Sequence, residues 1–199
     1  MIYIVGLGPG SKEYILPKAI EILNGSDKII GFSRAIDSLE FIKNEKVKVK
    51  SLSEIIELLN ENETISIIAS GDPTFYGITE YVQNKYNGKI EVIPGISSFQ
   101  YLTCKLGKCW SGSYLGSVHG REDKFIEKVL DHKISIWLTD SKNTPLKLSQ
   151  ALFFNNIKCK VYVGENLSYK DEKIVEGTPE EIIKNNFGNL SILIVEREI

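Results

Sequence analysis

The first ten residues, MIYIVGLGPG, place a short run of β-branched residues directly before the loop Gly6-Leu7-Gly8-Pro9-Gly10. A stretch with helical spacing, Lys12–Asn24, follows this loop and is closed by Gly25. Strand, glycine-rich turn and helix in this order form the basic unit of α/β proteins, and ligands bind at such turns. The segment therefore predicts a parallel sheet with a ligand loop at the carboxyl end of its first strand.

The same alternation of strands and helices continues through the first half of the chain. Expected strands are Ile2–Leu7, Lys28–Phe32, Thr64–Ser70 and Lys89–Ile93. Expected helices are Lys12–Asn24, Ser53–Asn60 with Ser53 as its cap, and Ile96–Leu106. Alternation of this kind is best built as a mostly parallel sheet covered by helices on both faces.

The apolar periodicity breaks near residues 107–112, within LGKCWSGS, and a new series of elements begins after it. We therefore expect a domain boundary there, with an N-terminal α/β domain at residues 1–110 and a C-terminal one at 111–199. Expected strands of the second domain are Tyr114–Val118, Ile134–Leu138, Cys159–Val163 and Leu190–Val195, and its helices are Lys124–Leu130 and Pro145–Phe154. Lys170–Val175 alternates as an exposed strand does, which predicts a mixed sheet with hairpins. The fold class is α/β, with two α/β domains and a ligand cleft expected between them.

Composition narrows the class of protein. The 199 residues are 42% hydrophobic and 25% charged, which is typical of a globular chain and excludes disordered and collagen-like classes. A net charge of −2 provides no basic surplus for binding nucleic acid. Three cysteines without a CxxC pair predict neither disulfides nor a metal site. The lack of a disulfide framework leads us to expect a reducing, cytoplasmic location. We expect no membrane segment, because no apolar run is long enough to span a membrane.

Two further loops follow expected strands, Ser70–Gly77 (SGDPTFYG) and Pro94–Ser98 (PGISS). Because the carboxyl ends of parallel strands share one edge of a sheet, all three loops are expected at the same edge. Asp72 either accepts hydrogen bonds from a ligand's ribose or ammonium group, or caps a helix that starts near Pro73. The two serines of PGISS are either helix caps or ligand contacts.

A dinucleotide site is the first alternative for these glycine loops. The dinucleotide fingerprint requires G-x-G-x-x-G, but Ser11 occupies the position of the third glycine. Pro9 also removes a backbone amide that would otherwise face a pyrophosphate. A nucleotide-dependent oxidoreductase therefore remains an alternative that these residues disfavour.

The three loops, in this order and spacing, resemble the tetrapyrrole methylase family, whose members use S-adenosylmethionine. In the second half, GSVHGRED at 116–123, WLTDSKNTP at 137–145 and VGENLSYKDEKI at 163–174 are similar to one branch of that family. This branch methylates carbon 5 of the corrinoid precursor in cobalamin biosynthesis. The resemblance covers essentially the whole chain.

The resemblance implies a homodimer of two-domain chains, with a folded S-adenosylmethionine in the cleft between the domains. It implies methylation of cobalt-precorrin-7 at carbon 5 in the anaerobic pathway, with another ring carbon as the alternative, and a possible separate carbon-15 methyltransferase/decarboxylase as partner. The implied cofactor-binding residues are Gly71, Asp72, Tyr76, Ser97, Ser98, Leu138, Thr139, Glu165 and Asn166. The implied substrate-binding residues are Pro9, His119 and Arg121. Arg34 is a further substrate-binding candidate, because it follows the carboxyl end of the expected strand Lys28–Phe32 and can anchor a carboxylate.

The chemistry itself requires little from the chain. A sulfonium methyl group needs only a nucleophile aligned opposite the departing sulfur, so no nucleophilic triad is expected. A base is optional, and His119 is the candidate for a catalytic residue. For His119 the roles of base, hydrogen-bond donor and loop histidine stay open. Arg121 is suited to hold a substrate carboxylate in a bidentate fork.

Overall fold

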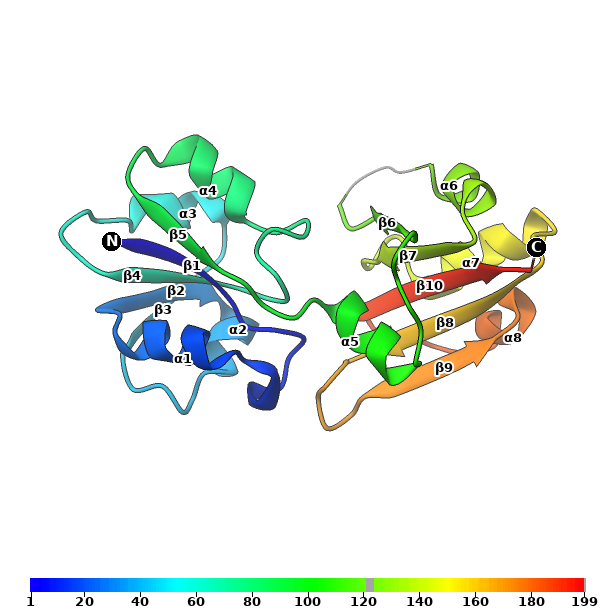
Figure 1. Cartoon of the computed structure of the whole chain (residues 1–199), viewed down its shortest axis with the longest axis horizontal. Helices are drawn as coiled ribbons and strands as arrows, with labels where there is room; N and C mark the ends of the chain where they lie inside the picture. The colour runs from blue at the N-terminus through cyan, green and yellow to red at the C-terminus, as the bar shows by residue number, and fades with distance from the viewer. Residues whose placement is uncertain (121–123, 199) are drawn as a thin grey trace. The chain divides into compact units, whose positions relative to one another are not determined.

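The structure, a computed structural model, describes residues 1–120 and 124–198 (Figure 1). The chain divides into two compact units, Met1–Ser98 and Phe99–Ile199, hereafter unit 1 and unit 2. Each unit has a five-stranded sheet of its own. The predicted α/β fold with two sheets is therefore confirmed, and each unit is described separately.

Unit 1 contains an all-parallel sheet with strand order β3-β2-β4-β1-β5. Its strands are β1 (Ile2–Gly6), β2 (Lys28–Phe32), β3 (Glu45–Val49), β4 (Ile65–Ala69) and β5 (Ile90–Ile93). Its helices are η1 (Lys12–Tyr14, a 3-10 turn), α1 (Pro17–Asn24), α2 (Ser33–Asp37), α3 (Leu52–Glu57) and α4 (Thr79–Lys85). The charged strand β3 lies at the edge of the sheet, where alternating lysines discourage pairing with another chain.

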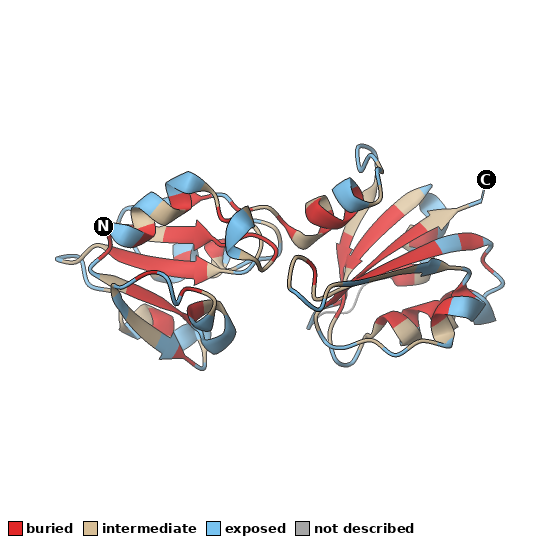
Figure 2. Cartoon of the chain, turned by 90° about the horizontal axis from the view of Figure 1, so that it is seen from below, coloured by how far each residue is buried: buried red, intermediate tan, exposed pale blue. Residues whose placement is uncertain are grey.

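Helices cover both faces of this sheet, and alternate strand residues supply the two cores. On one face, Val5 and Ile29 pack in a cluster with Leu23 of α1. On the other face, Ile4 packs in a cluster with Ile55 of α3. Figure 2 shows the resulting buried strands at the centre of the unit. Burial on both faces explains why these strands are continuously apolar.

Two helix starts differ from the sequence prediction. The expected helix Lys12–Asn24 is interrupted, because Leu16 precedes Pro17 and has the extended conformation that residues before proline prefer. The helix α1 therefore begins at Pro17. For α3 the cap is Ser51 and not Ser53, since the Ser51 side chain accepts a hydrogen bond from the backbone N–H of Glu54.

Unit 2 contains a mixed sheet with strand order β6-β7-β10-β8-β9. Its strands are β6 (Tyr114–Ser117), β7 (Ile134–Leu138), β8 (Cys159–Glu165), β9 (Lys173–Gly177) and β10 (Ser191–Arg197). Its helices are α5 (Ser98–Lys105), α6 (Phe125–Asp131), α7 (Pro145–Phe154) and α8 (Pro179–Ile183). β6 and β7 are parallel, while β8 and β9 form an antiparallel hairpin, as the alternating segment predicted.

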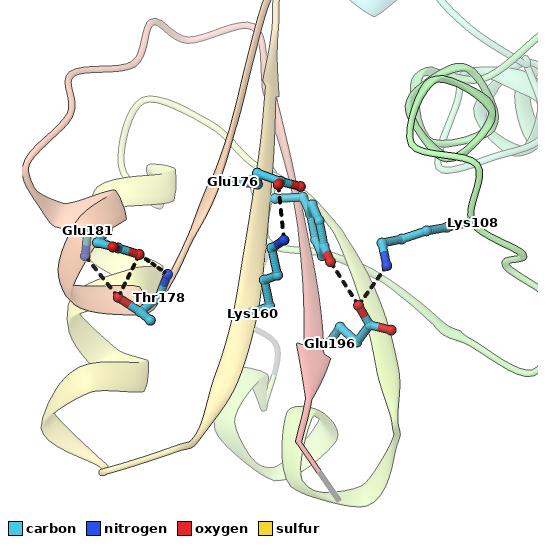
Figure 3. A network of polar contacts seen from close by, with 7 residues as sticks. Lys108, Lys160, Glu176, Thr178, Glu181 and Glu196 are labelled. Atoms are coloured by element: carbon cyan, nitrogen blue, oxygen red, sulfur yellow. Dashed lines mark hydrogen bonds and ion pairs between the residues drawn. The ribbon is translucent and has the colours of Figure 1, made fainter.

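Helix α8 was not among the elements expected from the sequence, although its start carries a clear signal. Thr178 precedes Pro179, and Glu181 stands three residues after Thr178. The Thr178 side chain accepts a hydrogen bond from Glu181 N, and the Glu181 carboxylate accepts one from Thr178 N (Figure 3). This reciprocal pair is a capping box, which the sequence pattern T-x-x-E predicts.

The division between the units falls earlier than the sequence-based boundary after residue 110, because α5 packs with the elements that follow it. A Cβ placed on Gly164 of β8 would lie 3.1 Å from Leu102 Cδ1 of α5. Beyond α5, Lys108 Nζ donates to Glu196 Oε2 at 2.7 Å, and Tyr162 Oη donates to the same oxygen at 2.9 Å (Figure 3). The loss of apolar periodicity marks the end of helix α5, but this helix packs against elements that come later in the chain.

The Lys108–Glu196 pair has a testable pH dependence. The hydrogen bond from Lys108 holds the pKa of the Glu196 carboxyl below its usual value, against the opposing effect of burial. The stabilisation is thus fully present above the unfolded pKa of about 4.3 and is lost as the pH falls through the lower folded pKa. We expect Glu196→Gln to lower the free energy of unfolding by about 1 kcal/mol at pH 7 and by progressively less below about pH 4.

Urea unfolding of both proteins over a pH series measures this difference. Lys184→Met is the matched control, because it removes an exposed pair with Glu180 and should change little at any pH. If Glu196→Gln lowered the free energy of unfolding by the same amount at every pH, the stabilisation would not come from the ionised Glu196 carboxylate.

Candidate functional site

The GLGPG and GDP loops are joined by backbone hydrogen bonds beyond the ends of their strands. Leu7 N donates to Ala69 O at 2.9 Å, and Gly71 N donates to Gly8 O at 2.8 Å. Gly8 N returns a bond to Gly71 O at 3.3 Å. Because β1 lies between β4 and β5, the three predicted loops meet at one edge of the unit 1 sheet.

Three glycines make this meeting possible. A Cβ on Gly6 would lie 2.6 Å from Gly95 N, and a Cβ on Gly95 would lie 2.1 Å from Gly71 O. Gly71 itself has φ +68°, a left-handed conformation that favours glycine. The loops therefore contact each other through backbone atoms, and a side chain at Gly6 or Gly95 would push them apart. We call this the glycine junction of Gly6, Gly71 and Gly95.

Asp72 links two of these loops and caps no helix. Its Oδ1 accepts hydrogen bonds from the N–H of Thr74, at 2.8 Å, and from the Thr74 hydroxyl. Its Oδ2 accepts a bond from Gly95 N at 3.2 Å. The helix expected near Pro73 is a wrong prediction, since α4 begins at Thr79. Asp72 instead forms an Asx turn within its own loop.

The other unit 1 cofactor candidates lie on the same two loops. Ser97 is buried, and its Cα would be 3.6 Å from a Cβ on Gly71. Ser98 is the first residue of α5. Tyr76 is 40% exposed and has φ +51°, a conformation uncommon for residues with a side chain. Its ring packs edge-to-face against Phe75, with centroids 5.0 Å apart.

The unit 1 substrate candidates differ in exposure. Pro9 is buried within the first loop, so its ring offers little surface to a ligand. Arg34 is exposed in α2, directly after the carboxyl end of β2. Of these two residues, Arg34 is therefore the one whose side chain is open to a carboxylate from solution.

The four cofactor candidates of unit 2 gather at one edge of its sheet. Leu138 ends β7 and pairs with Ile192 at the start of β10. The hydroxyl of buried Thr139 donates to the carbonyl of Ser191 at 2.6 Å. Glu165 pairs with Ser191 from the other side of β10. Asn166 N donates to Leu190 O at 3.0 Å, which holds Asn166 beside the same strand end.

His119 contacts this cluster, a link that the sequence analysis did not make. Its ring nitrogen Nδ1 lies 3.0 Å from the carbonyl oxygen of Thr139. Its backbone N–H donates to the Ser117 hydroxyl at 3.2 Å. The side chain is exposed. Arg121, the neighbouring candidate, lies outside the described residues.

Asp140 is a functional candidate that the sequence analysis missed. Its Oδ2 accepts a hydrogen bond from Gly120 N at 2.7 Å, and its Oδ1 accepts bonds from Lys142 N at 2.8 Å and Asn143 N at 2.6 Å. These bonds, the one from Gly120 foremost, lower the pKa of the Asp140 carboxyl. An aspartate followed by Ser-Lys-Asn at the end of a strand is a recognisable turn signal, but its bond to Gly120 is not local.

Two features are absent from residues 1–120 and 124–198. No helix there has both the length and the apolar character needed to cross a membrane. No group of three or more His, Cys, Asp and Glu side chains in those ranges is arranged to hold a metal ion.

Two curated proteins similar to this chain are named as methyltransferases. A protein of Methanocaldococcus jannaschii named probable cobalt-precorrin-7 C(5)-methyltransferase is 34% identical, and the match covers 98% of each chain. The cobalt-precorrin-7 C(5)-methyltransferase of Salmonella typhimurium is 30% identical over 87% of this chain and 89% of its own.

Solved structures agree on the fold. The precorrin-6Y methylase of cobalamin biosynthesis from Archaeoglobus fulgidus is 25% identical and superposes with a TM-score of 0.79, covering 100% of this chain and 99% of its own. A uroporphyrin-III C-methyltransferase from Thermus thermophilus, crystallised with S-adenosylhomocysteine, is 21% identical with a TM-score of 0.77. That match covers 98% of this chain and 91% of the other, and it shows the fold alone.

The family description "Tetrapyrrole (Corrin/Porphyrin) Methylases" matches residues 1–183. This match covers the whole sheet of unit 1 with its three glycine-bearing loops, and unit 2 as far as the end of α8. With it, the predicted family is confirmed, and the chain belongs to the tetrapyrrole methylases.

Proposed function

We propose that this protein transfers the methyl group of S-adenosylmethionine to carbon 5 of cobalt-precorrin-7 in cobalamin biosynthesis. The observation that carries the proposal is the near full-length similarity to two proteins named for this reaction, at 34% and 30% identity. The first of these matches covers 98% of this chain and so extends through both units. We further propose that the protein acts in the cytoplasm as a homodimer, beside a separate carbon-15 methyltransferase/decarboxylase.

The residues of unit 1 suit the cofactor chemically. A carboxylate offers about four acceptor positions, and Asp72 uses three of them for Thr74 and Gly95. The fourth suits a ribose hydroxyl or an ammonium group, both of which S-adenosylmethionine has. Within the described part of the chain, Ser97 alone lies within 4 Å of a Cβ placed on Gly71, so a ligand can approach the backbone closely.

We propose that the cofactor contacts are the residues that the family resemblance implies. These residues are Gly71, Asp72, Tyr76, Ser97 and Ser98 of unit 1, and Leu138, Thr139, Glu165 and Asn166 of unit 2. The bound cofactor supplies an electrophilic methyl group on a sulfonium sulfur. The chain contributes alignment of the two reactants and exclusion of water, which strengthen the electrostatic interactions within the site.

The substrate contacts are proposed on charge and exposure. Corrinoid precursors carry several carboxylates, and an exposed guanidinium binds a carboxylate through two parallel hydrogen bonds. Arg34 meets this requirement, and Arg121 is proposed for the same role. Buried Pro9 would act by shaping its loop, and His119 would face the substrate from unit 2.

Calorimetric titration with S-adenosylhomocysteine tests the cofactor, with NADH and ATP as parallel controls. We expect binding in the micromolar range for S-adenosylhomocysteine alone. Binding of NADH instead would favour an oxidoreductase and contradict the proposal.

Turnover with cobalt-precorrin-7 and ¹³C-methyl S-adenosylmethionine tests the reaction. We expect one labelled methyl group, which NMR of the product locates at carbon 5. A label at another ring carbon would overturn the assigned position while keeping the methyltransferase class.

A further inference from the structure

We infer that His119 accepts the proton that methyl transfer releases, and that Asp140 is the positioning residue that holds His119 in place. This inference rests on the proposed function and deepens it. It selects one of the roles that the sequence left open for His119, and it gives a role to Asp140, which lies in the segment WLTDSKNTP but had no role assigned to it.

The hydrogen bond at Nδ1 determines the tautomer of His119. A backbone carbonyl oxygen can only accept, so at 3.0 Å the His119 Nδ1 must donate its proton to Thr139 O. In the neutral ring, the proton is therefore on Nδ1 and the lone pair is on Nε2. Among the described residues, Nε2 has no hydrogen-bond partner, and the side chain is exposed. His119 thus presents an acceptor beside Thr139, one of the proposed cofactor contacts.

Asp140 clamps the loop that carries His119. The loop follows β6, and Asp140 follows β7, its parallel neighbour. One carboxylate oxygen accepts from Gly120 N, directly after His119, while the other accepts from Lys142 N and Asn143 N. Asn143 closes the arrangement by donating its amide to Val118 O at 3.0 Å. The two loops are therefore tied together on both sides of His119.

The charge of Asp140 has a second effect. The carboxylate interacts favourably with the positive form of the His119 ring, one of the causes that lower the pKa of Asp140. A carboxylate with a lowered pKa stays ionised at neutral pH. It would stabilise the imidazolium that forms when His119 takes up a proton, as the aspartate does in hydrolase triads, although here it bonds to the neighbouring backbone.

The step balances in atoms and charge. A π-electron pair of the conjugated macrocycle forms the new C–CH₃ bond, and the S–CH₃ bond breaks with its electron pair going to sulfur. The sulfonium becomes a neutral thioether, and the macrocycle takes up its positive charge. The macrocycle then loses one proton to His119 Nε2, which becomes an imidazolium, and this proton finally leaves to solvent.

Isosteric variants separate the two nitrogens of His119. His119→Asn places an amide N–H near the position of Nδ1, so it keeps the bond to Thr139 O but removes the Nε2 acceptor. We expect it to lower kcat about 100-fold with KM changed less than about threefold, as loss of a general base does. His132→Asn is the matched control, because the Nδ1 of His132 bonds Lys128 O at 2.9 Å in the same way, and we expect no change in kcat.

Asp140→Asn tests the positioning role. Asparagine keeps a single acceptor oxygen, so it cannot hold Gly120 N and the Lys142–Asn143 turn together. We expect about a tenfold loss of kcat in Asp140→Asn. In the His119→Asn background, we expect less than a twofold further loss, because Asp140 acts through His119.

Additive losses of kcat in the double variant would show that Asp140 is only a structural residue and does not act through His119. Full activity of His119→Asn would show that His119 is not the base. ¹⁵N NMR of the two histidines gives a readout that does not depend on turnover. We expect a protonated Nδ1 on His119, and protonation of Nε2 instead would contradict the tautomer. Wild-type protein that neither binds S-adenosylhomocysteine nor methylates a corrinoid would contradict the proposed function and not this tautomer.

Discussion

Gly95→Ala is expected to destabilise unit 1 by about 3 kcal/mol and to abolish measurable binding of S-adenosylhomocysteine. The added methyl group would lie 2.1 Å from Gly71 O and 2.9 Å from Gly6 Cα. Both are backbone atoms in other loops, so no side-chain rotation relieves the overlap, and overpacking of this kind costs about 1–3 kcal/mol or more. Separating the loops would also move Asp72 away from Gly95 N, which it contacts at 3.2 Å.

Urea unfolding and calorimetric titration measure the two effects. Gly25→Ala is the matched control, because its added Cβ would meet nothing closer than Glu21 O at 3.6 Å and the backbone there is helical. We expect this control to bind S-adenosylhomocysteine as the wild type does. A Gly95→Ala protein with normal stability and affinity would show that the glycine junction tolerates side chains.

Asp72→Ala is expected to weaken S-adenosylhomocysteine binding about 100-fold. The change removes the acceptor for Thr74 and Gly95 together with the proposed contact to the ligand. Hydrogen bonds to charged groups contribute about 1.5–3 kcal/mol, and each 1.4 kcal/mol changes affinity tenfold. Asp72→Asn should lose less affinity for S-adenosylhomocysteine, because the remaining side-chain oxygen can still accept a hydrogen bond from Thr74.

Asp37→Ala provides the control for loss of a carboxylate in the same unit. Asp37 is exposed and pairs with Lys48 on the surface, so its removal should leave affinity unchanged. Calorimetric titration of the three folded variants with S-adenosylhomocysteine measures these differences in affinity. If Asp72→Ala keeps the wild-type affinity, Asp72 serves only to shape its turn.

The sequence predicted those features that depend on neighbouring residues. β2 (Lys28–Phe32) and β7 (Ile134–Leu138) begin and end at the predicted residues, because each is a short apolar run with clear flanks. The three loops were found through their glycines and prolines, which mark turns by restricting or freeing the backbone. Their common edge followed from the parallel order of the strands.

Features that depend on distant partners were missed. The hydrogen bond that Gly95 N donates to Asp72 joins positions 23 residues apart, and the one that Gly120 N donates to Asp140 joins positions 20 apart. The sequence placed α5 before the expected boundary, whereas its contacts group it with unit 2, because its packing partner Gly164 lies much later in the chain. Local patterns predict where a turn occurs, but the tertiary structure determines which distant groups form hydrogen bonds with it.

The topology of unit 1 sets the order in which its sheet can assemble during synthesis. Strand β1 is made before both of its neighbours, since Ile2 pairs with Ile65 of β4 and Ile90 of β5. At about 5–20 residues per second, ribosomes need roughly 3 to 12 seconds to extend from the first of these residues to the second. Throughout that interval the apolar strand β1 is made but unpaired. During this time β1 exposes apolar surface that the finished sheet buries, and such surface makes a partly folded chain prone to aggregation.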